Sequence, residues 1–287
     1  RFNVPYIFVL LFSIIPALFL VRIFILFHDC THSSFIKNKK LMAILGHVFG
    51  TLVFTPFYKW QDEHLTHHRT VGNLEKRGTG DVWTLTVDEY QSSKWYKKLG
   101  YRLYRNPLVL FLIGPSYVFL LSERLPFNIK SKKALFSVIL TNVLLTGIIL
   151  TVSFTIGFNY YLLIQLPVII IAATLGVWLF YVQHQYEDVY WEENSKWDIT
   201  EAALKGSSVY KLPFLLRWFT GSIGYHNIHH LNARVPNYNL HKLHKKHTFA
   251  ESKQFKIFSS FKLMTLTLYD FKERKLISFR RYKKLYA

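Results

Sequence analysis

Histidines at metal-ligand spacing are the residues of this sequence best suited to chemistry. There are 13, and nine fall in four tight clusters. Residues at i, i+3 and i+4 share one face of a helix, so the imidazoles of a cluster converge there. Neighbours at i+3 and i+4 diverge by roughly a hundred degrees around the helix, so one face can serve two ions. The clustered residues are His28 and His32; His64, His67 and His68; His184; and His226, His229 and His230.

The number of imidazoles favours two metal ions over one. Imidazole suits Zn, Cu, Fe and Ni, so ligand type does not select the metal. A structural zinc takes four protein ligands and a catalytic zinc three plus water. Nine clustered histidines exceed either set and suit two ions with open positions. The single Cys30 excludes an internal disulfide and a multi-cysteine zinc site.

The other four histidines are interpreted without a metal. His47 lies in an apolar block and is expected to be a hydrogen-bonded packing residue. His241, His244 and His247 alternate with lysines, as expected of a solvated or headgroup-facing helix surface.

Apolar blocks indicate a membrane protein. Residues 4–27, 134–158 and 160–182 are each long enough to cross roughly 30 Å of hydrocarbon. Residues 41–57 and 108–121 are shorter and contain Pro56 and Pro115. If 41–57 crossed, the first two histidine clusters would lie on opposite sides and could not share metals. Both short blocks are therefore predicted to be interfacial or re-entrant.

Basic residues give the expected orientation. The net charge is +19, and 34 of the 36 Lys and Arg lie in residues 28–133 and 183–287. The positive-inside rule places both segments in the cytoplasm or at its membrane interface, with the turn near residues 157–159 outside. A basic nucleic-acid-binding protein would not contain three apolar spans, so no nucleic-acid partner is predicted. Because the chain opens at Arg1 on the outer side, a further span is expected before it.

The predicted fold is therefore a single all-α membrane domain over residues 1–287, with transmembrane helices, interfacial helices and a cytoplasmic histidine-rich cap. Residues 255–287 mix aromatic and basic side chains. They are predicted to form a basic surface helix that attracts anionic phospholipid, or that docks an acidic electron carrier.

The cluster forms His28-Asp-Cys-Thr-His32, His64-Leu-Thr-His67-His68 and His226-Asn-Ile-His229-His230 resemble the three boxes of the integral membrane fatty acid desaturases. Residues 72–90 and 178–188 resemble the acyl-lipid desaturases of bacilli, and the likeness covers roughly residues 21–240. Three residues lie between the histidines of the first box, as in acyl-lipid enzymes. The third box begins with His226, where front-end desaturases carry Gln, and residues 1–287 contain no stretch that resembles a cytochrome b5 domain.

The resemblance implies a bacterial membrane enzyme with a di-iron centre on the cytoplasmic side. Such an enzyme inserts a cis double bond into a fatty acyl chain of a membrane lipid while O2 is reduced to water. Its electrons come from an external carrier such as ferredoxin or flavodoxin. The eight box histidines would be ligands, and His184 would match the further histidine after the last span. An unactivated methylene has no acidic proton, which agrees with a metal–oxygen oxidant.

Polar residues beside the boxes are candidates to orient the ligands, because a ligating histidine usually donates its other N–H to a carboxylate, carbonyl or water. Ordinary solvated side chains are an equally good interpretation of each. The candidates are Asp29, Asp62, Glu63, Glu187, Asp188 and Asn227. Gly78-Thr-Gly80-Asp81 is interpreted as a turn.

Two alternatives stay open. A related di-iron hydroxylase or ketolase of alkanes or carotenoids would carry the same boxes. A histidine-rich membrane metal carrier is the non-enzymatic alternative, although carriers usually place polar ligands within their spans.

Overall fold

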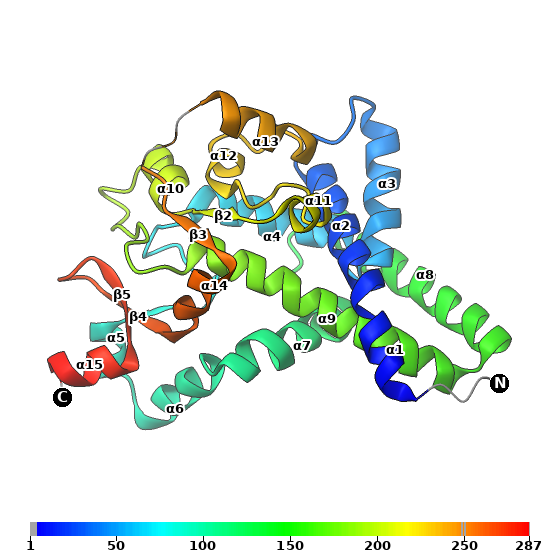
Figure 1. The fold of residues 1–287 in the computed structure, drawn as a ribbon, viewed down its shortest axis with the longest axis horizontal. Helices are drawn as coiled ribbons and strands as arrows, with labels where there is room; N and C mark the ends of the chain where they lie inside the picture. Colours follow the sequence, from blue (N-terminus) through cyan, green and yellow to red (C-terminus); the bar gives the residue numbers. More distant parts are fainter. Residues whose placement is uncertain (1–4, 248, 250, 287) are drawn as a thin grey trace. The chain divides into compact units, whose positions relative to one another are not determined.

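The computed structural model describes residues 5–247, 249 and 251–286. Val4 and Ala287, which bound two predicted segments, lie outside the described residues, as does Arg1. The described chain is mostly helical, with short strands (Figure 1). It divides into two compact units, each made of segments that are separate in the sequence.

The first unit contains Arg1–Asp62, Leu112–Val177 and Trp218–Gly221. Its elements are α1 (Tyr6–Phe12), α2 (Ile14–Thr31), α3 (Lys39–Leu52), the first residues of α4 (Phe57–Thr70), the end of η1 (Val109–Ile113), α7 (Gly114–Leu120), η2 (Ser122–Arg124), α8 (Lys132–Ile156), most of α9 (Phe158–His184) and the end of α11 (Phe214–Phe219). Three stretches of the described chain are long and apolar enough to cross a membrane: Tyr6–Thr31, Lys132–Ile156 and Phe158–His184. Apolar side chains are exposed along them, Phe154 for example, which suits contact with lipid.

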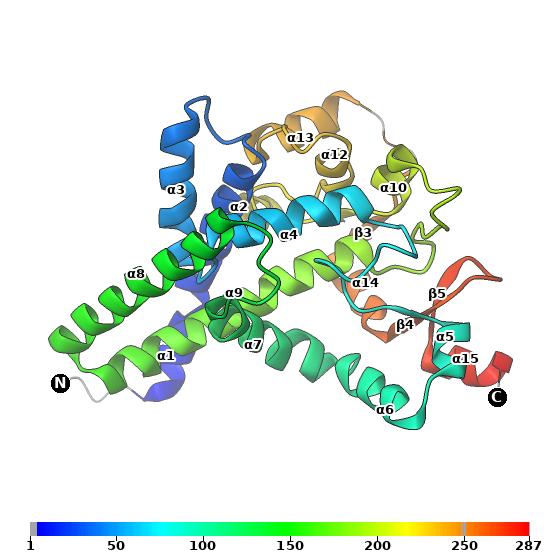
Figure 2. The same ribbon diagram turned by 180° about the vertical axis from the view of Figure 1, so that it is seen from behind.

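Helices α8 and α9 form a hairpin in the region where the sequence predicts a turn (Figure 2). α8 begins at a cap in which the Ser131 hydroxyl accepts the Ala134 N–H. It ends before Gly157, whose φ of 94° is a conformation that glycine adopts without strain. The reversal therefore needs only one residue between the two long helices.

The short block at residues 41–57 forms α3 and the start of α4, bent by 96° at the break between them. α3 has 14 residues and is about 21 Å long, too short to cross the bilayer alone. The break is held by the Thr55 N–H, which donates to the Gly50 carbonyl over 2.7 Å. A Cβ on Gly46 would lie 2.5 Å from the Phe57 ring, so this glycine lets the chain fold back closely. The bend is compatible with a broken span or a re-entrant segment.

A buried polar network joins α4, η2 and α8 within the first unit. Lys59 Nζ lies 3.1 Å from Glu123 Oε1, and both side chains are at most 5% exposed. The Lys59 N–H donates to Ser137 Oγ on α8 over 3.2 Å. Arg124 donates to the Asn142 side chain and to the Phe54 carbonyl. Loss of one member would leave a buried charge unpaired, so the network fixes how these segments pack.

The second unit contains Glu63–Phe111, Trp178–Arg217 and Ser222–Ala287. Its helices are the end of α4, α5 (Val87–Ser92), α6 (Trp95–Tyr104), the start of η1 (Val109–Ile113), the end of α9, α10 (Ile199–Lys205), the start of α11 (Phe214–Phe219), α12 (His226–Leu231), α13 (Asn237–Lys246), α14 (Ile257–Ser260), η3 (Phe261–Thr265) and α15 (Phe279–Tyr286). Its strands are β1 (Leu85–Thr86), β2 (Val209–Lys211), β3 (Gln254–Lys256), β4 (Leu266–Asp270) and β5 (Lys275–Ser278).

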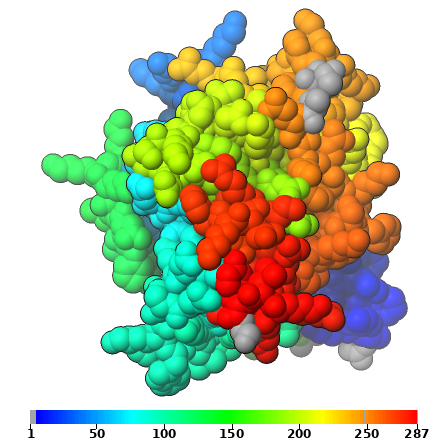
Figure 3. Space-filling model, turned by 90° about the vertical axis from the view of Figure 1, so that its left-hand side faces the viewer, coloured from blue at the N-terminus to red at the C-terminus, as the bar shows by residue number. Residues whose placement is uncertain are grey.

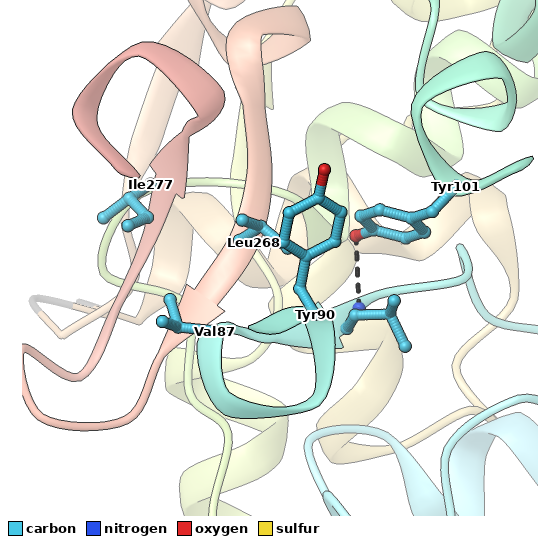
Figure 4. Close-up of a cluster of buried hydrophobic side chains, with 6 residues drawn as sticks. Val87, Tyr90, Tyr101, Leu268 and Ile277 are labelled. Carbon is cyan, nitrogen blue, oxygen red and sulfur yellow. Dashed lines mark hydrogen bonds between the residues drawn. The ribbon is translucent and has the colours of Figure 1, made fainter. Parts of the chain in front are cut away.

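Two small sheets tie distant segments of the second unit together. β1 pairs in parallel with β4, which pairs antiparallel with β5, and β2 pairs in parallel with β3. The core beside the first sheet contains Tyr90, Tyr101 and Leu268 (Figure 4). The Tyr101 hydroxyl accepts the Leu85 N–H over 3.1 Å and donates to the Thr267 carbonyl. Burial raises the pKa of Tyr101, which keeps this hydroxyl a donor.

The prediction of one basic helix over residues 255–287 is wrong. The segment forms α14, η3, the β4–β5 hairpin and only a short helix, α15. Consecutive buried residues such as Leu268 and Tyr269 cover both faces of β4, which a surface helix could not do. In α15, Phe279, Tyr282 and Tyr286 pack against the core while its basic residues face outward. This C-terminal segment lies against the α5–α6 region of the same unit (Figure 3).

Candidate metal centre

Seven predicted ligands lie on three helices of the second unit. The second box lies on α4, His184 is the last residue of α9, and the third box occupies α12. His67, His184 and His229 are at most 5% exposed. Such burial of imidazoles requires partners for their nitrogens, because an unsatisfied polar group costs about 1–3 kcal/mol.

The first group of converging nitrogens comes from α4 and α12. One nitrogen each from His64, His68 and His229 lies within 4.8 Å of the others. The Nε2 atoms of His68 and His64 are 3.2 Å apart, and those of His229 and His68 are 3.0 Å apart. Histidines separated by 161 residues in sequence are thus side by side.

The second group adds the end of α9. One nitrogen each from His67, His184 and His230 again lies within 4.8 Å of the others. His226 lies beside this group, because its Nε2 is 2.9 Å from His184 Nε2 and 3.1 Å from His230 Nε2. The second and third boxes each contribute to both groups, as the diverging positions i+3 and i+4 predict.

The first box lies in the other unit, at the C-terminal end of α2. His28 and His32 are 4% and 8% exposed, and their ring centroids are 4.8 Å apart. Asp29 Oδ1 lies 3.6 Å from His28 Nδ1. The i, i+4 spacing therefore brings these two rings together on one helical face, as predicted.

Two oxygen acceptors orient histidines of the second group. His67 Nδ1 lies 2.6 Å from Asp81 Oδ1, and the two side chains are 1% and 7% exposed. His184 Nδ1 lies 3.0 Å from the Gly206 carbonyl oxygen. Carboxylate and carbonyl oxygens only accept, so Nδ1 carries a proton in both rings, and Nε2 is the nitrogen left to present a lone pair when the ring is neutral.

Asp81 was missed by the sequence analysis, which placed it in a turn without a role. The turn itself is present, with Gly80 at φ 72°. A Cβ on Gly80 would lie 3.0 Å from the His67 Cβ, so the glycine permits the close approach. A carboxylate directly after a glycine-rich turn, close in sequence to a histidine box, is the signal that was available.

The predicted orienting residues lie in varied surroundings. Glu187 and Asp188 face Lys275, and Asp188 also lies 2.6 Å from Lys253 Nζ, whose hydrogen bond lowers the pKa of that carboxyl. The Asn227 amide donates to Ser252 Oγ over 3.0 Å. Asp62 accepts a hydrogen bond from Ser131, and Glu63 precedes the second box on α4.

The remaining four histidines belong to neither group of converging nitrogens in the described part of the chain. His47 packs against the rings of Phe57 and Tyr58, as predicted, but its buried Nδ1 has no hydrogen-bond partner among the described residues, so the predicted hydrogen bond is not found at this nitrogen. His241 Nδ1 is 2.8 Å from the Tyr225 hydroxyl, and His244 stacks on the Tyr225 ring. Partial burial lowers the pKa of His241 and His244, so both favour the neutral form.

The donor set fits metal ions. His67 Nε2 is buried and has no hydrogen-bond partner among the described residues, although its Nδ1 is bound to Asp81. Burial, and then the imidazoles of His68 and His226, hold the pKa of His230 well below its usual value. Neutral imidazoles with buried, convergent lone pairs are the form that metals bind.

Replacing Asp81 by Asn is expected to weaken metal binding about 10- to 100-fold, because the charge behind His67 is lost while its tautomer is kept. Titration of the metal-free protein with Fe(II) measures this. Asp88→Asn, an exposed carboxylate in the same segment, is the matched control. Equal affinities for the two variants would contradict the role of Asp81.

The described chain is a mostly helical protein with three stretches long and apolar enough to cross a membrane and a buried histidine cluster that could hold metal. The family model for fatty acid desaturases matches residues 4–258. The chain therefore belongs to the fatty acid desaturase family. Its members are oxidoreductases, so the predicted family and enzyme class are confirmed.

Curated proteins with similar sequences are also named as desaturases. A fatty acid desaturase of Bacillus subtilis (strain 168) is 44% identical over 98% of this chain and 80% of its own length. An sn-1 acyl-lipid omega-3 desaturase (ferredoxin) of Nostoc sp. (strain 36) is 28% identical over 77% of this chain and 62% of its own. An sn-1 oleoyl-lipid 12-desaturase of Synechocystis sp. is 26% identical over 77% and 63%. The chain thus spans less than two thirds of the two cyanobacterial proteins.

Proposed function

We propose that this protein inserts a cis double bond into the fatty acyl chains of membrane lipids. The reaction removes two hydrogens from adjacent methylenes and reduces O2 to two waters. O2 takes up four electrons and four protons: two of each come with the hydrogens of the acyl chain, two electrons from an external carrier and two protons from solvent. The observation that carries the proposal is the pair of histidine groups on α4, α9 and α12 in a chain of this family.

Nine histidines are proposed as ligands of two iron ions. His64, His68 and His229 would hold one ion, and His67, His184 and His230 the other, with His226 beside the second. His28 and His32 are included because of their box spacing and their burial at the end of α2. Iron bound there would supply redox chemistry able to oxidise an unactivated C–H bond, which zinc would not.

Roles for the neighbouring residues follow from their bonds. Asp81 and the Gly206 carbonyl would fix the tautomers of His67 and His184, and Asp29 would orient His28. Asp62, Glu63, Glu187, Asp188 and Asn227 stay candidates from their positions beside the boxes.

The substrate and donor are proposed from the relatives. The names of acyl-lipid desaturases of Nostoc and Synechocystis include ferredoxin. An acidic ferredoxin or flavodoxin is therefore proposed as donor here, attracted by the net charge of +19. Anionic phospholipid would contact the outward-facing basic residues at the membrane surface.

Analysis of product lipids tests the function. The protein is expressed in a host that lacks unsaturated fatty acids, and the lipids are derivatised and analysed by mass spectrometry. A new double bond without added oxygen is the expected product. A hydroxyl or keto group would instead support the alternative of a di-iron hydroxylase or ketolase. Metal uptake by reconstituted vesicles without any lipid product would support a carrier.

The active site is proposed to face the cytoplasm, which predicts a labelling pattern. In a Cys30→Ser background, single cysteines at the exposed positions Lys37, Lys76 and Lys196 are expected to react with an impermeant maleimide only from the cytoplasmic side. A cysteine at Asn159 is expected to react only from outside. Labelling of Lys37 and Lys76 from opposite sides would mean that residues 41–57 span the membrane, which would exclude a shared metal centre.

A further inference from the structure

The helix that follows the third histidine box carries a cationic face. α13 turns Asn237 and Leu240 inward, both at most 1% exposed, and leaves Lys242, Lys245 and Lys246 exposed. Among the described residues, no carboxylate lies within ion-pair distance of these three lysines. From residue 202 to residue 250 the sequence has seven Lys or Arg and no Asp or Glu. The positive charge of α13 is therefore not neutralised locally.

α13 is also fixed to the metal-binding segment. It packs on α12, which holds the third box, and the two helices lie side by side in both ribbon views (Figures 1 and 2). Tyr225, the residue before His226, stacks on His244 with ring centroids 4.3 Å apart. Its hydroxyl lies 2.8 Å from His241 Nδ1. His241 and His244 of α13 therefore both contact Tyr225, which fixes the position of Lys242, Lys245 and Lys246 relative to the third box.

The chemistry of this face favours a protein over a lipid surface. A helix that inserts into a membrane surface places apolar side chains on its free face. α6 does so, with Trp95 75% exposed and Leu103 56% exposed. On α13, by contrast, the exposed side chains are Tyr238 and the three lysines, so charged side chains outnumber apolar ones there. A lysine-rich face of this kind suits a carboxylate-rich partner.

We propose that the α13 lysine face, defined as Lys242, Lys245 and Lys246, is the docking surface for the acidic one-electron carrier. This rests on the proposed desaturase function. Each reduced carrier that docks loses one electron and leaves oxidised, so two dockings supply the two electrons required for one double bond. Complementary charge brings the carrier to the helix that packs on the third box.

Charge reversal tests the proposal. The variant Lys242→Glu/Lys245→Glu/Lys246→Glu is compared with Arg280→Glu/Lys283→Glu/Lys284→Glu on α15, which reverses three exposed charges elsewhere in the same unit. Both are reconstituted in neutral phosphatidylcholine nanodiscs, and an acidic bacterial ferredoxin is the probe. Its binding is measured directly, and its KM and the kcat are measured at two salt concentrations.

The α13 variant is expected to weaken ferredoxin binding and to raise the ferredoxin KM about 10-fold or more at low salt, with kcat at saturating ferredoxin within about twofold of the wild type. The difference should shrink at high salt, where the screening length falls to about 3 Å at 1 M. A third variant, Lys242→Gln/Lys245→Gln/Lys246→Gln, removes the three charges without reversing them and should also weaken ferredoxin binding. It keeps the test valid if the Glu variant does not fold.

Wild-type binding by the α13 Glu variant, or equal weakening by the α15 variant, would overturn the docking surface. If the Glu variant does not fold, wild-type binding by the Gln variant would overturn it as well. Because ferredoxin binding is measured without turnover, the proposed docking surface and the proposed desaturase function can be overturned independently of each other. Weakened binding specific to α13, with no double bond formed even by the wild type, would support docking and overturn the desaturase function.

Discussion

Replacing His68 by Ala is expected to reduce double-bond formation to below about 1% of the wild type, because a metal ligand is lost. His68 Nε2 lies 3.2 Å from His64 Nε2 and 3.0 Å from His229 Nε2. Its ring also stacks on His230 at 4.2 Å, so it lies next to both groups. Product lipids quantified by mass spectrometry give the activity, and gel filtration in detergent shows whether the protein remains folded.

The matched control is His247→Ala. His247 is exposed at the end of α13 and belongs to neither group of nitrogens. This variant is expected to keep most of the activity. If His247→Ala were inactive and His68→Ala active, the division of the histidines into ligands and surface residues would be wrong.

Removal of the metal is the second change for which we expect a large effect on activity. Dialysis of the purified protein against a chelator is expected to abolish desaturation, and Fe(II) should restore it whereas Zn(II) should not. Zinc also binds imidazole but has no redox chemistry with which to activate O2. The chelated protein is compared with a sample dialysed without chelator. Full activity of the chelated protein, or recovery with zinc, would contradict an iron-dependent reaction.

The main parts of the site could be predicted because their signals are local. Spacings of three and four residues place histidines on one face of a helix, and α4 and α12 present them in this way. Long apolar runs likewise produce α8 and α9 whatever their partners are. The ends of these helices fall close to the predicted ones, because Gly157 and the cap at Ser131 are sequence signals as well.

What the sequence did not reveal depends on contacts between distant segments. Asp81 reaches His67 because a turn returns the chain to α4. Tyr225 meets His241 and His244 only once α13 packs on α12. The pattern of aromatic and basic residues over 255–287 was interpreted as a helix, yet β4 lies between β1 and β5 and pairs with both. Tertiary contacts outweighed the local pattern at these positions.

The pairing of His226 with His184 shows how the two kinds of information combine. The sequence identifies both residues, since one opens a box and the other ends an apolar span. Only the fold brings their Nε2 atoms to 2.9 Å across 42 residues. It also reveals the acceptor behind His184, the Gly206 carbonyl, which has no sequence signature.

The metal content of the purified protein tests the central claim most directly. Elemental analysis by mass spectrometry, normalised to protein by amino-acid analysis, gives the number and kind of ions per chain. Two groups of convergent imidazoles predict about two irons per chain. A single zinc with negligible iron would contradict the proposed centre, and the oxygen chemistry proposed for it would be excluded.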